Sequence, residues 1–309
     1  MGRYVLTRLA QSIPVLLGST LLVYALVFAM PGDPIRAMCG QKCPTDAALG
    51  VIRAEYNLDK PFIVQYLIFV KNAFTGDFGK TFSGRSVDDI IAGAFPNTLF
   101  LALLAVVFEI IIGVGIGIWV GMRKGGIFDS TVLVFTLVLI SIPTFVLGFI
   151  SQLYLGMRWH VAFATVGDNI DIAHMWLPAL VLASSSIAYV CRLTRSSVQA
   201  NLSSDHVRTA RAKGLSMRRV SIVHVLRNSL IPVVTYVGGD LAVLLGGAVL
   251  TEAIFNIKGI GYQLYQGIQL GEGPLVVSII TLMVIVYIIS NILIDILYAV
   301  LDPRIRHEK

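Results

Sequence analysis

Residues 99–122, LFLALLAVVFEIIIGVGIGIWVGM, contain one charged side chain, that of Glu109. A helix needs about 20 predominantly apolar residues to cross the hydrocarbon core of a bilayer. This stretch is long enough, so it predicts a membrane-spanning helix. Gly113, Gly117 and Gly121 are spaced four residues apart, a pattern that lets two helix backbones approach closely. We therefore expect this span to pack tightly against another helix.

Five more segments of the chain are similarly long and apolar. They are Leu9–Met30, Thr131–Leu155, Met175–Cys191, Leu230–Leu250 and Leu275–Leu301. The chain is 56% hydrophobic, and only 14% of its residues are charged, whereas about a quarter are charged in a soluble domain. The predicted fold class is therefore an all-α polytopic membrane protein with about six transmembrane helices.

Some of these segments carry features that modify the simple pattern. Met175–Cys191 is the shortest and is a marginal span. Pro143 and Pro232 can kink the third and fifth spans. The first segment follows Arg3 and Arg8, as the core of a cleaved signal peptide would, but it is longer than the usual about 7–15 residues. We therefore favour a retained first span.

Lys and Arg residues gather in alternate loops between the apolar segments. In membrane proteins the loops rich in Lys and Arg lie on the cytoplasmic side, so this distribution indicates the orientation. The basic residues are densest between the fourth and fifth spans, at Arg192, Arg195, Arg208, Arg211, Lys213, Arg218, Arg219 and Arg227. This pattern predicts cytoplasmic termini and explains the net charge of +6 without a nucleic-acid partner. Residues 1–98 would comprise the first transmembrane helix and a long extracytoplasmic loop, and residues 99–309 a five-helix core.

Glu109, Asp240 and Asp295 are acidic residues within apolar segments. Burying a charge in lipid costs about 3 kcal/mol or more, so each side chain should face protein or water. Asp240 lies near the middle of its span, and we predict that it lines a solvated pathway. An interhelical hydrogen bond is the alternative for Asp240, and it is the role that we favour for Glu109.

Two cysteines, Cys39 and Cys43, lie close together in the predicted extracytoplasmic loop. A disulfide is permitted in an oxidising compartment. The short spacer needs a suitable turn, so two free thiols remain the alternative.

The chain carries no recognisable catalytic or nucleotide-binding motif. Gly79-Lys80-Thr81 resembles the end of a phosphate-binding P-loop, but Phe74 stands where that motif needs its first glycine. The histidines show no metal-ligand spacing, and no nucleophile elbow is present. We therefore expect a non-enzymatic chain that binds no metal or other cofactor.

The segment SSDHVRTARAKG, which begins at residue 203, is basic and bounded at both ends. Ser204 or Asp205 can cap a helix, and Gly214 suits the left-handed residue that ends one. Val207 and Ala210 would form a modest apolar face. An ordinary basic loop would explain the charge but not these two helix ends. We therefore predict a short surface helix held between two spans.

The chain resembles the permeases of ABC importers, specifically the B-type subunit of dipeptide and oligopeptide systems. The resemblance covers essentially the whole chain. It rests on the order and spacing of seven motifs: Pro31-Gly-Asp-Pro34, Leu58-Asp-Lys-Pro61, Gly76-Asp-Phe-Gly79, Arg192-Leu-Thr-Arg195-Ser-Ser, Arg208-Thr-Ala-Arg-Ala-Lys-Gly214, Arg227-Asn-Ser-Leu-Ile-Pro232 and Asp302-Pro-Arg-Ile-Arg306.

The resemblance implies a type I importer permease fold in the bacterial cytoplasmic membrane, and a role for the short basic helix. In this family the matching stretch is the coupling helix, which sits in a cleft of an ATPase subunit. The residues that would form the coupling helix here are Asp205, Arg208, Thr209, Ala210, Arg211, Ala212, Lys213 and Gly214. Arg208-Thr209-Ala210 stands where the family has Glu-Ala-Ala, which changes the charge offered to that cleft.

The resemblance also implies partners. They are a homologous second permease subunit that forms a heterodimer with this chain, two ABC ATPase subunits that carry ATP and Mg, and an extracytoplasmic solute-binding protein. The loop after the fifth span would reach toward the binding protein through Glu252, Phe255, Asn256, Lys258, Gly259 and Gly261, together with residues 31–98.

The alternatives are a secondary transporter or channel that works without an ATPase, and a non-transporting membrane scaffold. A secondary transporter would show inverted repeats and a relay of intramembrane charges. We see no clear repeat and only scattered carboxylates. The substrate stays open between peptides and the haem, metal chelates or sugars that related importers carry.

Overall fold

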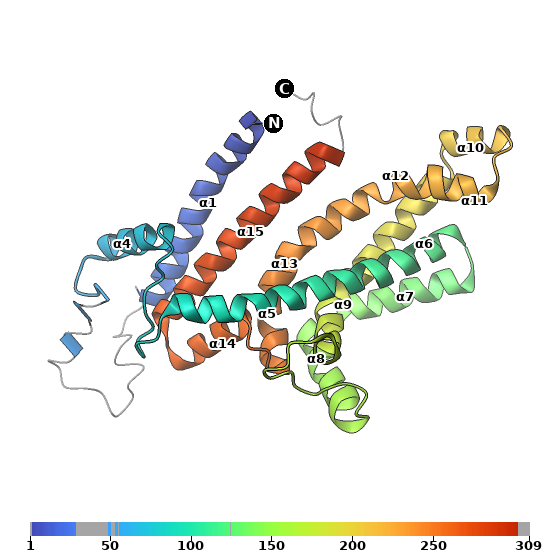
Figure 1. The fold of residues 1–309 in the computed structure, drawn as a ribbon. Coiled ribbons are helices and arrows are strands. Elements are labelled where there is room, and N and C mark those ends of the chain that lie inside the picture. Colours follow the sequence, from blue (N-terminus) through green and yellow to red (C-terminus); the bar gives the residue numbers. More distant parts are fainter. Residues whose placement is uncertain (1, 29–48, 51–52, 55, 124, 302–309) are drawn as a thin grey trace. The chain divides into compact units, whose positions relative to one another are not determined.

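A computed structural model describes residues 2–28, 49–50, 53–54, 56–123 and 125–301. Helices dominate this part of the chain (Figure 1). In chain order they are α1 Gly2–Phe28, α4 Phe62–Phe74, α5 Val87–Phe108, η1 Glu109–Val114, α6 Gly115–Met122, α7 Ile127–Ser141, α8 Thr144–Ser151, η2 Gln152–Arg158, α9 Ile172–Leu202, α10 Asp205–Ala212, α11 Met217–Arg219, η3 Val220–Leu226, α12 Arg227–Ser229, α13 Ile231–Phe255, α14 Ile260–Leu270 and α15 Gly273–Leu301. The segments η1, η2 and η3 are π-helical.

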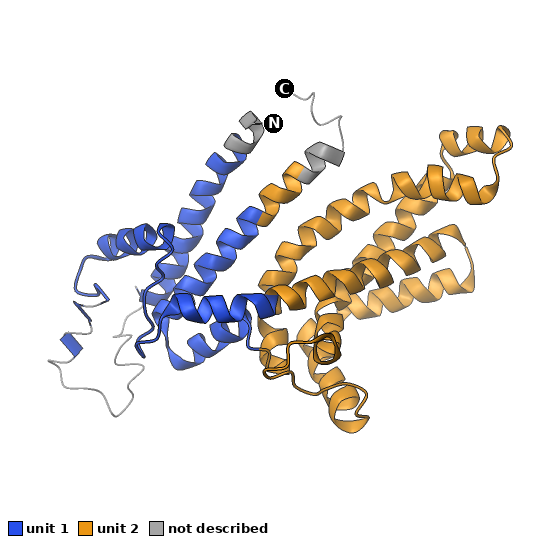
Figure 2. Ribbon diagram, in the orientation of Figure 1, with its two compact units in different colours: residues 1–98, 258–289 blue, residues 99–257, 290–309 orange. Residues whose placement is uncertain are grey.

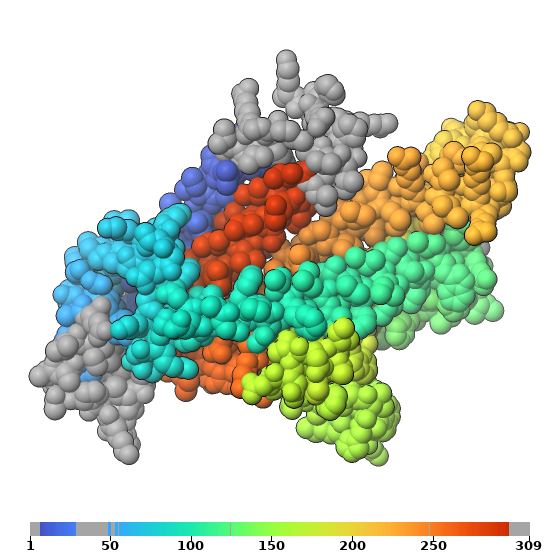
Figure 3. Space-filling model, viewed as in Figure 1, coloured from blue at the N-terminus to red at the C-terminus, as the bar shows by residue number. Residues whose placement is uncertain are grey.

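The chain divides into two compact units (Figure 2). Unit 1 comprises Met1–Thr98 and Lys258–Ile289, and unit 2 comprises Leu99–Ile257 and Ser290–Lys309. In the space-filling view, the gold atoms of α10 and α11 lie at one extremity of unit 2 (Figure 3).

The predicted membrane spans are present as long helices or as bent helix pairs. Among the described residues, four helices are long and apolar enough to cross a bilayer: Thr7–Phe28, Val87–Met122, Ile172–Leu202 and Gly273–Ile296. Two bent pairs bring the number to six if each pair is one span: Ile127–Ser141 with Thr144–Arg158, and Met217–Ser229 with Ile231–Gly246. The expected all-α membrane fold is therefore confirmed.

Both bends lie beside the prolines that were expected to produce kinks. The first pair bends by 97°, with Pro143 at the N-cap of α8. The second pair bends by 43°, with Pro232 in the first turn of α13. Proline lacks an N–H and disrupts the preceding helical turn, so the chain changes direction where each one occurs.

The fourth span differs from its prediction as a short, marginal segment. Helix α9 runs over Ile172–Leu202 and is the most buried of the candidate spans. Ser184, Ser186 and Thr194 lie on its buried surface. These polar residues lower the apparent hydropathy of a helix whose neighbours are other helices of unit 2 rather than lipid. The hydropathy pattern therefore underestimated the length of α9.

A ladder of glycines joins the span 87–122 to α9. The pairs in contact are Gly113 with Val190, Gly117 with Thr194, and Gly121 with Val198. A Cβ added to Gly117 would lie 2.6 Å from the Thr194 Cβ, which is closer than real Cβ atoms approach. Gly115 lies between Gly113 and Gly117 in the sequence, but a Cβ added there would have nothing within 4 Å. The expected close packing is confirmed, and α9 is the helix on the other side.

Aromatic packing holds α1 to α4 in unit 1. The Tyr24 ring packs against the rings of Phe62, Tyr66 and Phe69, with centroids 5.5 to 5.8 Å apart. The Tyr66 hydroxyl donates to the Leu17 carbonyl oxygen at 2.8 Å. These contacts fix α4 along the side of the first span.

Candidate functional site: a short basic helix carried by two spans

The basic segment of the sequence forms α10, and its N-terminus differs in one detail from the prediction. Ser204 is the N-cap, with an extended backbone at φ −74° and ψ 156°. Its hydroxyl donates to the Asn201 carbonyl oxygen at 2.6 Å and makes no capping bond to α10. The predicted N-cap position of Ser204 is therefore confirmed, but its hydroxyl closes the end of α9 and does not cap α10. Asp205 still places a negative charge in the first turn, where the helix dipole favours it.

The C-terminus of α10 ends in a left-handed glycine, as predicted. Gly214 has φ 76°. Its N–H donates to the Arg211 carbonyl oxygen at 2.9 Å, and the Leu215 N–H donates to the Ala210 carbonyl oxygen at 3.3 Å. These two bonds form a Schellman motif, which satisfies the last carbonyl groups of the helix. The helix is therefore a bounded element and not a continuation of α9.

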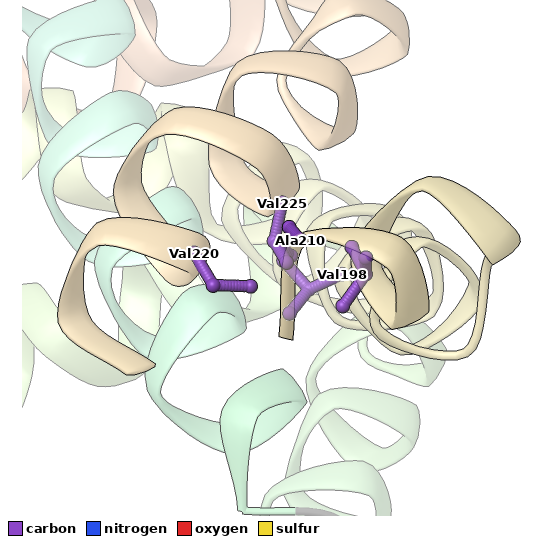
Figure 4. Close-up of a cluster of buried hydrophobic side chains, with 5 residues drawn as sticks. Val198, Ala210, Val220 and Val225 are labelled. Carbon is purple, nitrogen blue, oxygen red and sulfur yellow. The ribbon is translucent and has the colours of Figure 1, made fainter. Parts of the chain in front are cut away.

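One face of α10 is buried against the helices on either side of it in the chain. The cluster consists of Val198 from α9, Val207 and Ala210 from α10, and Val220 and Val225 from η3 (Figure 4). Val207 is 0% exposed and Ala210 is 5% exposed. Ala210 therefore packs inside this cluster, and its part in the predicted coupling helix stays a prediction.

The opposite face of α10 is exposed and carries three basic side chains and one acidic one. Its exposed residues among those predicted are Asp205, Arg208, Thr209, Arg211, Ala212, Lys213 and Gly214. The Asp205 and Arg208 side chains are 97% and 80% exposed, and their charged atoms are 3.8 Å apart. An ion pair this exposed contributes little stability, so both groups are available to a partner.

His206 is a further anchor of α10 that sequence reasoning missed. Its Nε2 lies 3.2 Å from the Ser204 hydroxyl and 3.2 Å from the His224 carbonyl oxygen in η3. The Asn228 side-chain nitrogen lies 3.4 Å away. The ring thus ties the start of α10 to the helix that leads into α13. Nothing in the sequence pattern distinguishes this histidine from one that makes no such contacts.

A buried ion pair fastens α7 to α9 one turn before Val198. The Asp129 carboxylate accepts hydrogen bonds from Nε and Nη2 of Arg195, the second at 2.7 Å. It also accepts the Gly125 N–H at 3.3 Å. The side chains are only 7% and 19% exposed. The sequence pattern marks Arg195 as one of the basic loop residues and as part of a family motif, but it does not point to Asp129 as its partner.

The segment predicted to contact a binding protein is mostly buried. Glu252 and Phe255 are 0% exposed, and Gly259 and Gly261 are also buried. The side chains of Glu252 and Phe255 thus pack inside the chain, and contact of this segment with a binding protein stays a prediction. Asn256 is half-buried in a left-handed conformation (φ 52°), and Lys258 is exposed.

A loop of unit 2 packs on the end of α13 beside this segment. The Val166 N–H donates to the Phe255 carbonyl oxygen at 2.8 Å, and the Gly167 N–H to the Asn256 carbonyl oxygen at 3.1 Å. The loop ends at Asp171, whose carboxylate caps α9 through the His174 N–H at 2.9 Å. Hydrogen bonds from the His174 side chain and backbone lower the pKa of Asp171.

Asp240, predicted to line a pathway, is 6% exposed within unit 2. It faces Glu109 from η1, the Ser186 hydroxyl from α9 and the Tyr236 hydroxyl from α13. The pathway role stays a prediction.

Cys39 and Cys43 lie outside the described residues. In the described part of the chain, no group of three or more His, Cys, Asp or Glu side chains could hold a metal ion.

Comparison with known proteins gives matches along the entire chain. Residues 113–307 match the family described as "Binding-protein-dependent transport system inner membrane component". Residues 1–102 match its N-terminal companion, "Binding-prot-dependent transport system membrane comp, N-term".

Curated relatives match over their full lengths. The chain is 35% identical over 339 residues to the dipeptide transport system permease protein DppB of Escherichia coli K12, and 35% identical over 338 residues to the di/tripeptide transport system permease protein DppB of Pseudomonas aeruginosa. It is 35% identical over 311 residues to the glutathione transport system permease protein GsiC of Shigella flexneri. In each case 100% of both chains is covered.

Proposed function

The chain belongs to the family of binding-protein-dependent transport system inner membrane components, and from this membership we propose that it conducts short peptides, with α10 as its docking element for an ATPase subunit. It is a multi-pass membrane protein and a permease subunit of an ABC importer. The peptide substrate and the docking role are our proposals.

The substrate proposal is supported by what the relatives are named for. Dipeptides, di- and tripeptides, and glutathione are all short peptides, and each relative matches this chain along its full length. Similarity spread over the entire permease favours a related cargo. The length and sequence of the peptide would be selected by the solute-binding protein.

The docking proposal is carried by the two-faced character of α10. Its apolar face is packed on α9 and η3, and its basic face is open to a partner. The helix η3 continues through α12 into α13, so a force on α10 would act on two long helices of unit 2 at once. This connection is what a coupling element needs to convert movement of an ATPase into movement of spans.

The partners follow from the same proposal. A second permease subunit would pair with this chain, two ATPase subunits would bind on the side where α10 lies, and a solute-binding protein would deliver peptide from the other side. The basic residues around α10 support a cytoplasmic position for that segment, and we infer that both termini lie on the same side. ATP would be bound by the ATPases alone.

The docking role is tested by reversing charge on the exposed face of α10. Arg208→Glu/Arg211→Glu should abolish co-purification of the ATPase subunits with the permease and reduce ATP-dependent uptake of a labelled dipeptide at least tenfold. Both side chains are exposed, so the folded permease should survive. The matched control is Arg218→Glu/Arg219→Glu on α11, which reverses the same number of exposed charges nearby.

Two results would overturn the proposal. Retention of the ATPases by the α10 variant, or equal loss in the α11 control, would show that α10 is not the docking element. Dipeptide uptake by the wild-type complex that needs an ion gradient and no ATP would instead indicate a secondary transporter.

A further inference from the structure

Two acidic side chains meet inside unit 2, and the docking mechanism does not involve them. Glu109 begins η1 in the second span, and Asp240 lies in the middle of α13. Glu109 is 0% exposed and Asp240 is 6% exposed. The two carboxyl groups lie near enough for their charges to repel each other. Both lie within segments that are long and apolar enough to cross a membrane.

The surroundings of the pair are polar but uncharged. The Ser186 hydroxyl from α9 and the Tyr236 hydroxyl from α13 face Asp240. Tyr189 of α9 stacks on Tyr236, with ring centroids 4.3 Å apart. Among the described residues, no lysine, arginine or histidine acts on either carboxyl.

These neighbours satisfy Asp240 only in part and leave Glu109 unsatisfied. Both carboxyl oxygens of Glu109, and Oδ2 of Asp240, are fully buried without a hydrogen bond of normal geometry in the described part of the chain. A buried carboxylate is costly unless it is paired or hydrogen-bonded. Two adjacent carboxylates would also repel each other, so both cannot be ionised here without a further ligand.

The backbone is built to bring Glu109 to this position. Glu109 is four residues before Gly113, and Ser186 is four residues before Val190, so both extend the glycine ladder by one step. The π-helical hydrogen bonding of η1 begins at Glu109 itself. A π-helical turn is wider than an α-helical one and is frequently found at functional sites. The turn that carries Glu109 packs directly against α9.

We propose that Glu109 and Asp240 hold one exchangeable proton between them, and that this shared proton fastens η1 to α13. Protonation of one carboxyl turns repulsion into an O–H···O hydrogen bond, with the second group as the ionised acceptor. Release of the proton would leave two facing carboxylates and loosen the contact. The proposal stands on contacts within unit 2 and does not depend on the transported substrate.

The test is infrared titration of the complete importer complex, combined with its thermal unfolding between pH 5 and 9. At pH 7 the wild type should show the carbonyl stretch of a protonated carboxyl. Glu109→Gln and Asp240→Asn should each lose that band, because an amide can donate a hydrogen bond to the remaining carboxylate. The wild-type unfolding temperature should fall by about 2–4 °C as pH rises, and that fall should be absent in both variants.

Glu272→Gln is the matched control. Glu272 is a buried acid of unit 1, 3% exposed, whose carboxylate accepts the Phe82 and Ser83 N–H groups at 2.7 and 3.2 Å. Both of its carboxyl oxygens are hydrogen-bonded to backbone and it is not part of the Glu109–Asp240 pair, so the band should persist in this variant.

Absence of the protonated-carboxyl band from the wild type would overturn the proposal, and this readout needs no variant to fold. Stabilisation of the wild type, but not of Glu109→Gln, by Na⁺, K⁺ or Ca²⁺ at constant pH would overturn it in favour of a cation site.

Discussion

Gly117 lies so close to Thr194 that no side chain fits between the two helices, and this contact fixes the second span against α9. The Cys191 carbonyl oxygen is equally near, at 2.7 Å from the position of an added Cβ. Because one neighbour is backbone, the space cannot be opened by rotating a side chain.

Gly117→Ala should therefore destabilise the permease by about 1–3 kcal/mol, the cost of overpacking a closely packed contact. The measurement is chemical or thermal unfolding of the purified subunit in detergent. Gly115→Ala is the control, since it adds the same atom two residues away in open space. Replacing glycine by alanine in a helix otherwise gains about 1 kcal/mol, so the control should be neutral or stabilising. If the two variants had the same unfolding stability, the close contact between Gly117 and α9 would be contradicted.

Gly214→Ala should loosen the end of α10. Its φ of 76° lies in the left-handed region, where a Cβ costs about 1–2 kcal/mol. Hydrogen exchange of the Gly214 and Leu215 amides, which close the Schellman motif, should accelerate by roughly tenfold in the alanine variant. Gly126→Ala, at φ −93°, adds a methyl group in a different loop without this strain. Unchanged exchange in the Gly214 variant would show that the turn tolerates alanine.

Val207→Ala should weaken coupling without touching the exposed face of α10. Removing two buried methyl groups costs about 1–2 kcal/mol of transfer free energy, and the cavity adds to it. We expect the ATPase subunits to remain bound but ATP-dependent uptake to fall, because the helix would shift on its support. Arg218→Ala, at an exposed position of α11, should leave uptake nearly unchanged at physiological salt. If the Val207 variant kept full uptake, the buried face of α10 would not be needed to anchor the helix.

Asp129→Asn should leave the Arg195 guanidinium without its buried partner. Loss of one member of a buried ion pair costs about 3–5 kcal/mol, and the lower value applies here because Arg195 is 19% exposed. Thermal unfolding would measure the loss. The double variant Asp129→Leu/Arg195→Leu removes both charges and should recover most of the stability. Failure of the double variant to recover would show that packing, rather than the lone charge, causes the effect.

Much of this architecture could be predicted from local sequence. Long apolar runs indicated the spans, Pro143 and Pro232 marked the bends, and Gly214 marked the end of α10. These features depend on backbone chemistry and on solvent preference, which each residue carries with it. The spacing of Gly113, Gly117 and Gly121 likewise predicted a close contact, although not the helix that makes it.

Other features depend on which helices meet. The length of α9 was underestimated because its serines face protein, and hydropathy assumes that a span faces lipid. Glu252 and Phe255 looked like loop residues available to a partner, and only packing buries them. The partners of Arg195 and His206 lie far away in the chain or on another helix, where no local pattern points to them.

The sequence by itself determined that this protein is a helical membrane protein with a short, bounded basic helix between two spans. Tertiary structure alone decided that Val207 and Ala210 anchor that helix on α9 and η3, and that Glu109 meets Asp240. The physical reason is that helix formation and membrane insertion are governed by neighbours along the chain. The environment of a buried charge or an apolar face depends on residues that packing brings in from elsewhere.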